Sequence, residues 1–401
     1  MDKSIEHEFH FSKRAQQLTS SAIREILKVT EKAEIISFAG GLPAPSGFPV
    51  DVIRLAFDKV LRDSGKVALQ YGTTEGFSPL RNWIAEEMNK EGANITSDQI
   101  LMVSGSQQAL DLISKIMVDD GDKILVENPS YLGALQAFSV YQPNYMPVLT
   151  DDGGLVPDSI TPQVAKNARF IYALPNFQNP TGRTLNLERR QKLVSIMANL
   201  NIPIIEDDPY GELRYNGTPK PSLLSLSNKL GGNVIRLGTF SKVLAPGLRL
   251  GYVIAPTSII KKLVQAKQAA DLHTCTLTQM AVYEVVKDGF LEQHLPKVRN
   301  IYKTQCNCML EAIQKEFPAE TKWTKPEGGM FLWINLPEYI DSTELLKKAV
   351  NRNVAFVTGR PFYIAPGYGQ NNTIRLSFAT VPEEKIKQGV SILGQLIKEN
   401  L

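Results

Sequence analysis

Short, nearly continuous apolar runs alternate with amphipathic stretches between residues 50 and about 290. The runs that we expect to be strands are QILMVSG, DKILVENP, ARFIYALP, IPIIEDD, NVIRLGTF and LGYVIAP. The stretches with helical periodicity include SQQALDLISKIMV, YLGALQAFSVY and NLERRQKLVSIMANL. Strands that are apolar on both faces and alternate with helices are typical of a mostly parallel sheet covered by helices on both sides.

The pattern changes toward both ends of the chain. Residues 12–30 have the periodicity of an amphipathic helix, with Ser20 or Ser21 as a possible cap, and residues 36–49 form a Gly/Pro-rich loop. A long helical stretch over about 281–316 precedes a second α/β pattern, made of GGMFLWINL, STELLKKAVNRN, VAFVTG, TIRLSFA and a final helix. We therefore predict an N-terminal helix and loop (1–49), a large domain (50–290) and a smaller C-terminal α/β domain (291–401).

Composition narrows the class of protein. The 401 residues are 43% hydrophobic and 21% charged, which is ordinary for a globular protein and long enough for more than one core. A net charge of +3 without a dense basic block does not indicate nucleic-acid binding, and no apolar run reaches the length of a membrane span. The start MDKSIEHEFH is unlike a secretory signal, and the three cysteines form neither CxxC nor an even framework, so we expect a cytoplasmic protein without a metal site.

Polar side chains gather where the expected strands end, and ligands bind at that edge of a parallel sheet. VSGSQQALDL places a turn and a helix N-terminus after a strand, which suits an anion such as phosphate. IYALPNFQNPTG holds Asn179 between prolines, IIEDDPYGEL ends in two aspartates, GTFSKVLAPGLRLGY carries Lys242, and NTIRLSFA carries Arg375.

Each of these groups also has a purely structural explanation. Lys242 would pair with Asp207 or Asp208, EDDPY would be a surface turn or a ligand cluster for a hard metal, and Asn179 would belong to turn chemistry. Arg375 would extend its charge to solvent. The coincidence of all these groups at the ends of strands in one sheet favours a binding site instead.

Pyridoxal 5′-phosphate (PLP) is a cofactor that uses all of these parts. Its aldehyde forms an imine with a lysine, whose pKa falls on desolvation. A buried carboxylate stabilises its protonated ring nitrogen, and an arginine clamps the carboxylate of an amino acid.

The chain resembles the fold-type I PLP-dependent aminotransferases of class I/II, and within them the 2-aminoadipate aminotransferase branch, which is LysN-like and kynurenine-aminotransferase-II-like. The resemblance extends from SSAIREIL to IRLSFA and rests on SFAGGLPAP, QYGTTEGFSPLR, SGSQQALDL, ENPSYLGAL, PNFQNPTG, EDDPYGEL and GTFSKVLAPGLRLGY, in the family's order. It implies an α/β fold in which a large PLP-binding domain with a mostly parallel sheet between helices adjoins a smaller α/β domain.

The resemblance also implies roles for individual residues. Lys242 would form the aldimine and move the proton at the substrate Cα, with Asp207 and Tyr210 as its catalytic partners. The cofactor-binding residues would be Tyr71, Ser106, Gln107, Tyr131, Asn179, Asp207, Tyr210, Thr239, Ser241, Lys242 and Arg249. Tyr71 would reach the site of the neighbouring subunit in a homodimer. The substrate-binding residues would be Arg24, Gly41, Asn179 and Arg375.

The implied reaction moves an amino group from an L-amino acid to a 2-oxo acid such as 2-oxoglutarate by a ping-pong mechanism. Arg24 would meet a distal carboxylate and thus favour 2-aminoadipate or glutamate, whereas a solvated helix face is its structural alternative. Aromatic or branched donors stay open, and Arg360 is a second cation without an assigned role. The alternative function is a PLP-dependent C–S β-lyase or other carbanion chemistry on the same fold. A regulator with a DNA-binding module is disfavoured, because only about 35 residues precede ISFAGG.

Overall fold

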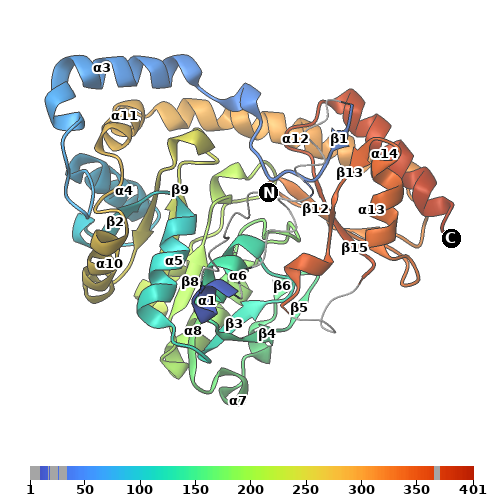
Figure 1. Cartoon of the computed structure of the whole chain (residues 1–401), viewed down its shortest axis with the longest axis horizontal. Coiled ribbons are helices and arrows are strands. Elements are labelled where there is room, and N and C mark those ends of the chain that lie inside the picture. Colours follow the sequence, from blue (N-terminus) through green and yellow to red (C-terminus); the bar gives the residue numbers. More distant parts are fainter. Residues whose placement is uncertain (1–9, 17, 19–25, 27–33, 365–370) are drawn as a thin grey trace, which may run out of the picture.

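The computed structural model describes residues 10–16, 18, 26, 34–364 and 371–401. Two α/β regions lie side by side in Figure 1, and the long helix α12 (Phe290–Glu316) runs from one to the other. Within these residues no helix is both long and apolar enough to cross a membrane.

The larger region is built on a seven-stranded sheet, counted within the described ranges. Its order is β2-β10-β9-β8-β7-β3-β4, and the pairs from β9 through β4 are parallel, whereas β10 runs antiparallel to both β9 and β2. The mostly parallel sheet predicted from the apolar runs is therefore confirmed. The strands are β2 (Ile100–Val103), β3 (Lys123–Glu127), β4 (Asn144–Val148), β7 (Ala168–Ala173), β8 (Ile204–Asp207), β9 (Val234–Thr239) and β10 (Gly251–Ile254).

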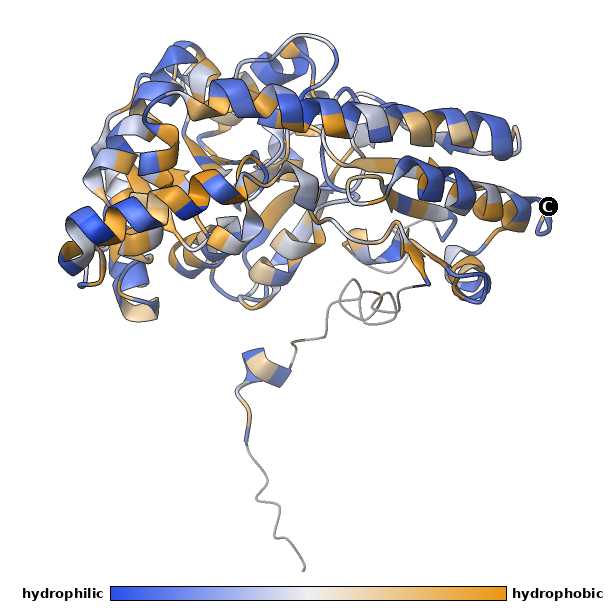
Figure 2. Ribbon diagram, turned by 90° about the horizontal axis from the view of Figure 1, so that it is seen from above, coloured by the Kyte–Doolittle hydropathy of each residue, from blue (hydrophilic) through white to orange (hydrophobic). Residues whose placement is uncertain are grey.

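Helices cover both faces of this sheet because successive side chains of each strand point to opposite sides. Leu101 and Val103 belong to one apolar cluster, whereas Ile100 and Met102 belong to the other. Figure 2 shows apolar residues concentrated inside and polar residues on the outer faces of the helices. The helices around this sheet are α3 (Val50–Ala68), α4 (Ser78–Lys90), α5 (Ser106–Met117), α6 (Leu132–Ser139), α7 (Pro162–Ala165), α8 (Leu187–Leu200), α9 (Leu223–Leu230), α10 (Thr257–Ala270) and α11 (Thr276–Val286).

The smaller region holds an antiparallel sheet of order β11-β12-β15-β14. The early strand β1 (Ile36–Ser37) pairs with β13 (Val354–Ala355), so the loop that follows residue 34 is tied to this region. The domain limits at 49/50 and 290/291 stay a prediction. The remaining elements here are β11 (Lys322–Trp323), β12 (Phe331–Asn335), β14 (Val357–Thr358), β15 (Thr373–Ser377), α13 (Ser342–Val350) and α14 (Glu383–Lys398).

Three expectations about elements differ from the structure. The helix predicted over 12–30 is wrong as one element, because α1 covers only Lys13–Gln16 and Leu18 has no regular structure, while Ser20 and Ser21 lie outside the described residues. The stretch over 281–316 is two helices, since Gly289 adopts a left-handed φ of 75° between α11 and α12. Strand β4 was not predicted, because it is a half-buried edge strand that contains a proline.

Candidate active site

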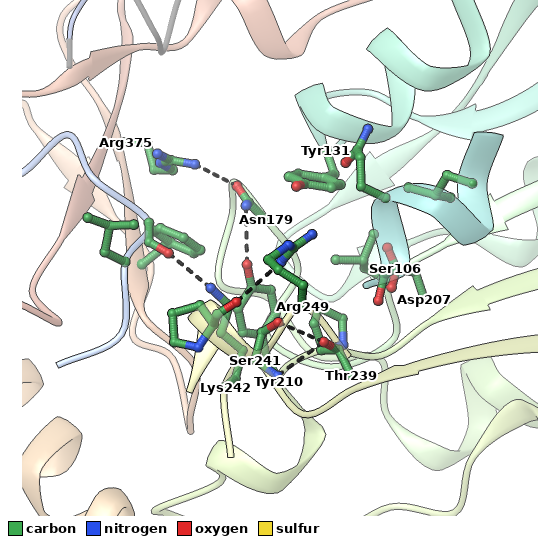
Figure 3. A pocket seen from close by; sticks show the side chains of 18 residues that line it. Ser106, Tyr131, Asn179, Asp207, Tyr210, Thr239, Ser241, Lys242, Arg249 and Arg375 are labelled. Atoms are coloured by element: carbon green, nitrogen blue, oxygen red, sulfur yellow. Dashed lines mark hydrogen bonds between the residues drawn. The ribbon is translucent and has the colours of Figure 1, made fainter. Parts of the chain in front are cut away.

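A cavity of about 450 Å³ opens at the carboxyl ends of the parallel strands, between the two regions. Both regions line it, since Gly41, Phe331 and Arg375 come from the smaller one. Figure 3 shows Arg375 across the cavity from Tyr131 and Ser106. It brings together most of the residues singled out in the sequence: Gly41, Ser106, Gln107, Tyr131, Asn179, Asp207, Tyr210, Thr239, Ser241, Lys242, Arg249 and Arg375.

Lys242 lies in the turn after β9, and its amine faces the cavity. Its Nζ donates a hydrogen bond to the carbonyl oxygen of Gly41 at 3.1 Å and lies 6.0 Å from the centre of the Tyr210 ring. Burial, followed by the positive charges of Arg375 and Arg249, lowers the pKa of the amine to about 8. A substantial share of this amine is therefore neutral and nucleophilic near neutral pH.

The two consecutive aspartates point to opposite sides of the sheet and have different partners. Asp208 accepts hydrogen bonds from Asn176 Nδ2 and Arg236 Nη2, both at 2.9 Å, and Arg236 also contacts Glu206 at 2.9 Å. Asp208 is thus neutralised away from the cavity. The alternative that Lys242 is present to pair with Asp207 or Asp208 is wrong in this structure.

Asp207 is only 2% exposed and forms part of the cavity wall. Its Oδ2 accepts a hydrogen bond of 2.7 Å from the Tyr172 hydroxyl, whereas its buried Oδ1 has no hydrogen-bond partner among the described residues. Burial raises the pKa of Asp207 to about 7, although the bond from Tyr172 lowers it. The free oxygen is suited to a ligand atom that carries a proton or a positive charge.

A chain of hydrogen bonds links the two regions across the cavity (Figure 3). Arg375 Nη1 donates to Asn179 Oδ1 at 2.8 Å, and Asn179 Nδ2 lies 3.4 Å from the Tyr210 hydroxyl. Arg375 Nη2 donates to the carbonyl of Ala39 at 2.9 Å, while Nε is buried without a partner in the described part of the chain. Burial lowers the pKa of Arg375 to about 10, so the guanidinium stays charged at neutral pH. It is a fixed cation with donors left to offer.

The position of Arg375 differs from the expectation that all of these groups lie at strand ends of one sheet. It lies in the middle of β15 in the smaller antiparallel sheet, and therefore not at a strand end of the large sheet. Its guanidinium carbon stands 4.3 Å from the centre of the Phe331 ring and 5.0 Å from that of Phe362. These two aromatic rings hold the cation at the cavity wall.

The opposite end of the cavity is suited to an anion. Helix α5 begins there at Ser106, whose buried hydroxyl has no hydrogen-bond partner among the described residues. Thr239 Oγ1 lies 2.9 Å from Ser241 Oγ, and Arg249 Nη2 donates to the carbonyl of Ser104 at 3.2 Å. Gly105 has φ +85°, and a Cβ on it would lie 2.6 Å from Arg249 Nη2, so only glycine lets the arginine approach this closely. Hydroxyls, a guanidinium and a helix N-terminus are the donors of a phosphate site.

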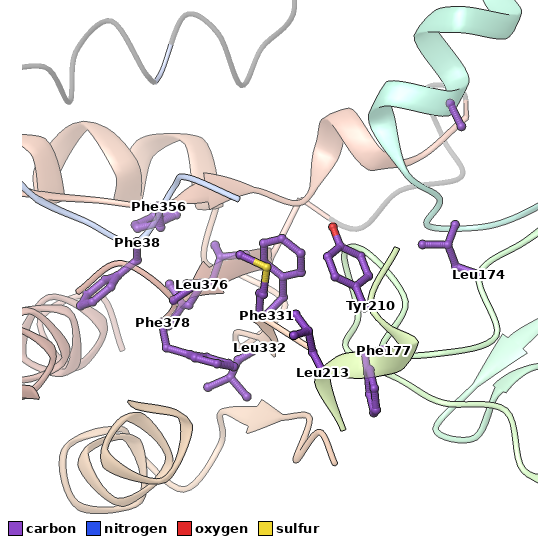
Figure 4. Close-up of a cluster of buried hydrophobic side chains, with 14 of the residues drawn as sticks. Phe38, Leu174, Phe177, Tyr210, Leu213, Phe331, Leu332, Phe356, Leu376 and Phe378 are labelled. Carbon is purple, nitrogen blue, oxygen red and sulfur yellow. The ribbon is translucent and has the colours of Figure 1, made fainter. Parts of the chain in front are cut away.

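Apolar side chains close the remaining wall. The Tyr131 ring packs over Gly133, where a Cβ would lie 2.5 Å from it, and burial raises the pKa of its hydroxyl to about 12. Phe331 meets Tyr210 edge-on with ring centres 5.9 Å apart, and Leu174 also lines the cavity. Figure 4 shows that Leu174, Tyr210 and Phe331 continue into the buried apolar core, which fixes the wall.

Two residues singled out in the sequence, Tyr71 and Arg360, do not line the cavity. Tyr71 is 78% exposed and contacts His273 edge-on at 5.8 Å. A third, Arg24, lies outside the described residues. Arg360 is exposed in the short 3₁₀ turn η6 (Arg360–Phe362), and its role stays open.

The sequence interpretation missed several residues that shape the site. Tyr172 and Phe362 sit within apolar segments and carry no motif of their own. Phe331 had a usable signal, since two glycines precede it in EGGMF and glycine pairs often mark a close approach of chains. Tyr172 and Phe362 are identified only by contacts with residues far away in the sequence, namely Asp207 and Arg375.

Comparisons with known proteins agree with this geometry. Residues 34–393 match the family described as "Aminotransferase class I and II". An aromatic-amino-acid aminotransferase 1 of Thermococcus litoralis is 44% identical over 99% of this chain and 96% of its own length, and a 2-aminoadipate transaminase of Thermus thermophilus is 44% identical over 97% and 96%. The solved structure of LysN, an α-aminoadipate aminotransferase of Thermus thermophilus complexed with N-(5′-phosphopyridoxyl)-L-leucine, matches with a TM-score of 0.89 at 43% identity, over 97% of both chains.

Proposed function

The chain belongs to the class I and II aminotransferases and is an enzyme that transfers amino groups, and from this premise we propose which residues hold its cofactor and substrate. The fold is that of the fold-type I aminotransferases, as predicted from the sequence. Because the named relatives are aminotransferases, amino transfer is favoured over the β-lyase alternative.

The residues of the cavity fit PLP. A lysine with a lowered pKa, a buried carboxylate with one free oxygen and a phosphate-type cradle at a helix N-terminus line the same 450 Å³ space. The observation that carries the proposal is the separation of Lys242 from Asp207. A lysine and an aspartate that share a buried cavity without pairing are arranged for a ligand that needs both.

When bound, PLP supplies an aldehyde that reacts with primary amines and a ring that accepts electron density from the bond broken at the substrate Cα. Lys242 provides the amine that holds the cofactor, and after substrate has bound it is free to move the proton at that Cα as general base and acid. Its lowered pKa suits both tasks, because the amine exchanges protons near neutral pH.

The other cavity residues orient the cofactor. Asp207 Oδ1 would accept from the ring nitrogen, and Asn179 and Tyr210 would hold the ring oxygen. Tyr131 would stack on the ring face. The phosphate would be held by Ser106, Gln107, Thr239, Ser241, Arg249 and the N-terminus of α5. The Gln107 side chain donates to the carbonyl of Gly133 at 2.7 Å, so we expect its backbone to take part.

Arg375 is the residue that we propose for the substrate α-carboxylate, with Asn179 and the backbone at Gly41 beside it. Besides Lys242, Arg249 and Arg375, no cation lines the described cavity wall, so a distal carboxylate needs a residue such as Arg24. We propose 2-aminoadipate, glutamate or an aromatic or branched amino acid as donor and a 2-oxo acid such as 2-oxoglutarate as acceptor, since relatives are named for aromatic amino acids and 2-aminoadipate.

A homodimer in the cytoplasm, with the predicted domain limits, completes the proposal. Tyr71 is exposed beside helix α3, whose apolar residues Leu55, Leu61 and Val67 also face solvent in the single chain. Several exposed apolar side chains on one helix support an interface between subunits. Tyr71 would then reach the partner's phosphate.

The first experiment is an absorbance spectrum of the purified protein before and after glutamate or 2-aminoadipate. We expect a visible band that disappears as a pyridoxamine phosphate band grows near the ultraviolet, without release of ammonia or pyruvate. Pyruvate from a cysteine conjugate would support the lyase, and the absence of any band after PLP addition would refute the cofactor assignment. Ordinary turnover in a Lys242→Ala variant would show that Lys242 does not have this role.

Subunit complementation tests the dimer. Lys242→Ala and Tyr71→Ala each impair the site to which they contribute. Hybrid dimers of the two variants carry one site in which both residues are intact, so mixing under exchange conditions should restore activity if Tyr71 acts across the interface. No recovery in proven hybrids would place Tyr71 outside the partner's site.

A further inference from the structure

Tyr172 lies behind Asp207, and within the described part of the chain its hydroxyl bonds to no other residue of the proposed catalytic set. It is fully buried in β7, and its hydroxyl donates 2.7 Å to Asp207 Oδ2 on the neighbouring parallel strand β8. We propose that Tyr172 is a positioning residue for amino transfer, which holds the Asp207 carboxylate ionised and turned so that Oδ1 faces the cofactor nitrogen. The inference rests on the proposed role of Asp207.

The register of the two strands makes this contact possible. Tyr172 is paired with Ile205, and Ile205 and Asp207 point to the same face of β8 because they are two residues apart. Two residues rise about 6.6 Å along a strand, a distance that a tyrosine side chain can span. A shorter side chain at position 172 would not reach the carboxylate.

The surroundings fix the tyrosine as a donor. Phe138 packs edge-on against its ring, with centres 5.4 Å apart and an interplanar angle of 81°. Burial and the charge of Asp207 raise the pKa of the Tyr172 hydroxyl, so it keeps its proton throughout the neutral range. Without this donor, Asp207 would have both carboxylate oxygens buried and unpaired, which favours the protonated acid.

Other groups near Asp207 do not substitute for this contact. Asp208 raises the pKa of Asp207, and Arg236 lowers it while its own hydrogen bond and ion pair go to Asp208 and Glu206. The titratable groups that interact electrostatically with Asp207 are Tyr131, Tyr172 and Tyr210 on its own side of the sheet and Asp208 and Arg236 on the other.

The test compares Tyr172→Phe, which removes one oxygen, with the control Tyr145→Phe. Tyr145 donates a bond of similar length, 2.8 Å, to the carbonyl of Leu135, and it does not line the cavity. For Tyr172→Phe we expect the Kd of the apoprotein for PLP to rise about tenfold at pH 7 and kcat to fall about tenfold, while KM for glutamate changes less than about twofold. Tenfold corresponds to about 1.4 kcal/mol, near the lower end for a hydrogen bond to a charged group.

Two readouts separate positioning from ordinary core packing. In an Asp207→Asn background, Tyr172→Phe should change the PLP Kd by less than about twofold, because its partner charge is gone. Tyr172→Phe should lower the Tm of the apoprotein more at pH 8, where Asp207 is ionised, than at pH 5. Tyr145→Phe should lower the Tm by the same amount at both pH values.

Unchanged PLP affinity and kcat in Tyr172→Phe, or an equal effect with and without the Asp207 carboxylate, would overturn the inference. If the wild-type apoprotein binds no PLP, the proposed function itself fails, which is a distinct result.

Discussion

The ionisation of Lys242 provides the most direct test of the site, because an ordinary lysine and this one differ strongly in reactivity. The perturbation is a pH titration of the apoprotein, in which the amine is not covered by cofactor. A pKa of about 8 in place of 10.5 corresponds to about 3 kcal/mol against the charged form. At pH 7 about one Lys242 amine in ten is neutral, against about one in three thousand for an unperturbed lysine.

The assay is competitive acetylation with trace acetic anhydride between pH 6 and 11, followed by mass spectrometry of the peptide that contains Lys242. We expect half-maximal reactivity near pH 8. Lys347 is an exposed internal control whose hydrogen bond to Glu344 raises its pKa, so its reactivity should increase only at a higher pH.

A companion variant separates the causes of the shift. Burial is the largest cause and Arg375 the second, so Arg375→Met should move the Lys242 midpoint upward without restoring 10.5. A Lys242 midpoint that coincides with that of Lys347 would refute the reasoning, since the cavity would then not disfavour the ammonium form.

Three further outcomes follow from the same geometry. Lys242→Met should stabilise the apoprotein against urea unfolding by up to about 3 kcal/mol below pH 8, because the charged amine is disfavoured in the folded state. This gain in stability should fade as the pH rises from 8 toward 10.5. Arg375→Ala should raise KM and lower kcat together, with kcat/KM reduced about 100-fold or more, since a charged two-point contact with the carboxylate is lost; unchanged steady-state kinetics would place it outside the site. Gly105→Ala should lower the free energy of unfolding in urea by about 1–2 kcal/mol, because residue 105 has a positive φ. It should also weaken PLP binding in a titration, because the added Cβ displaces Arg249. Equal PLP affinity would mean that Arg249 does not need this close approach.

The reliability of the sequence interpretation varied with how local each feature is. The strands β2, β3, β7, β8, β9 and β10 were predictable because strands buried on both faces of a sheet are apolar throughout. The edge strand β4 was missed because its Asn144–Val148 segment is half-buried and contains Pro147. The break at Gly289 was missed because amphipathic periodicity continues on both sides of it.

The residues of the candidate site also differ in how far the sequence alone identifies them. Lys242, Asn179 and the Gly105–Ser106 turn are recognisable from motifs, because each needs a specific local backbone shape. The choice between the two adjacent aspartates was not local: strand alternation turns Asp208 to Arg236 and Asp207 to the cavity, and only the packed sheet shows which face is which.

The sequence by itself determined the class of fold, the family resemblance and the residue types of the site, since these depend on apolar periodicity and on short motifs. Only the tertiary structure decided that Arg375 reaches the cavity from the middle of a strand, that Tyr172 supports Asp207 and that Lys242 stays unpaired with either aspartate. The reason is physical. Burial and the positive charges of Arg375 and Arg249 act on Lys242 through space, and these residues are far apart along the chain. The lowered pKa of Lys242 therefore exists only once the two regions enclose the cavity.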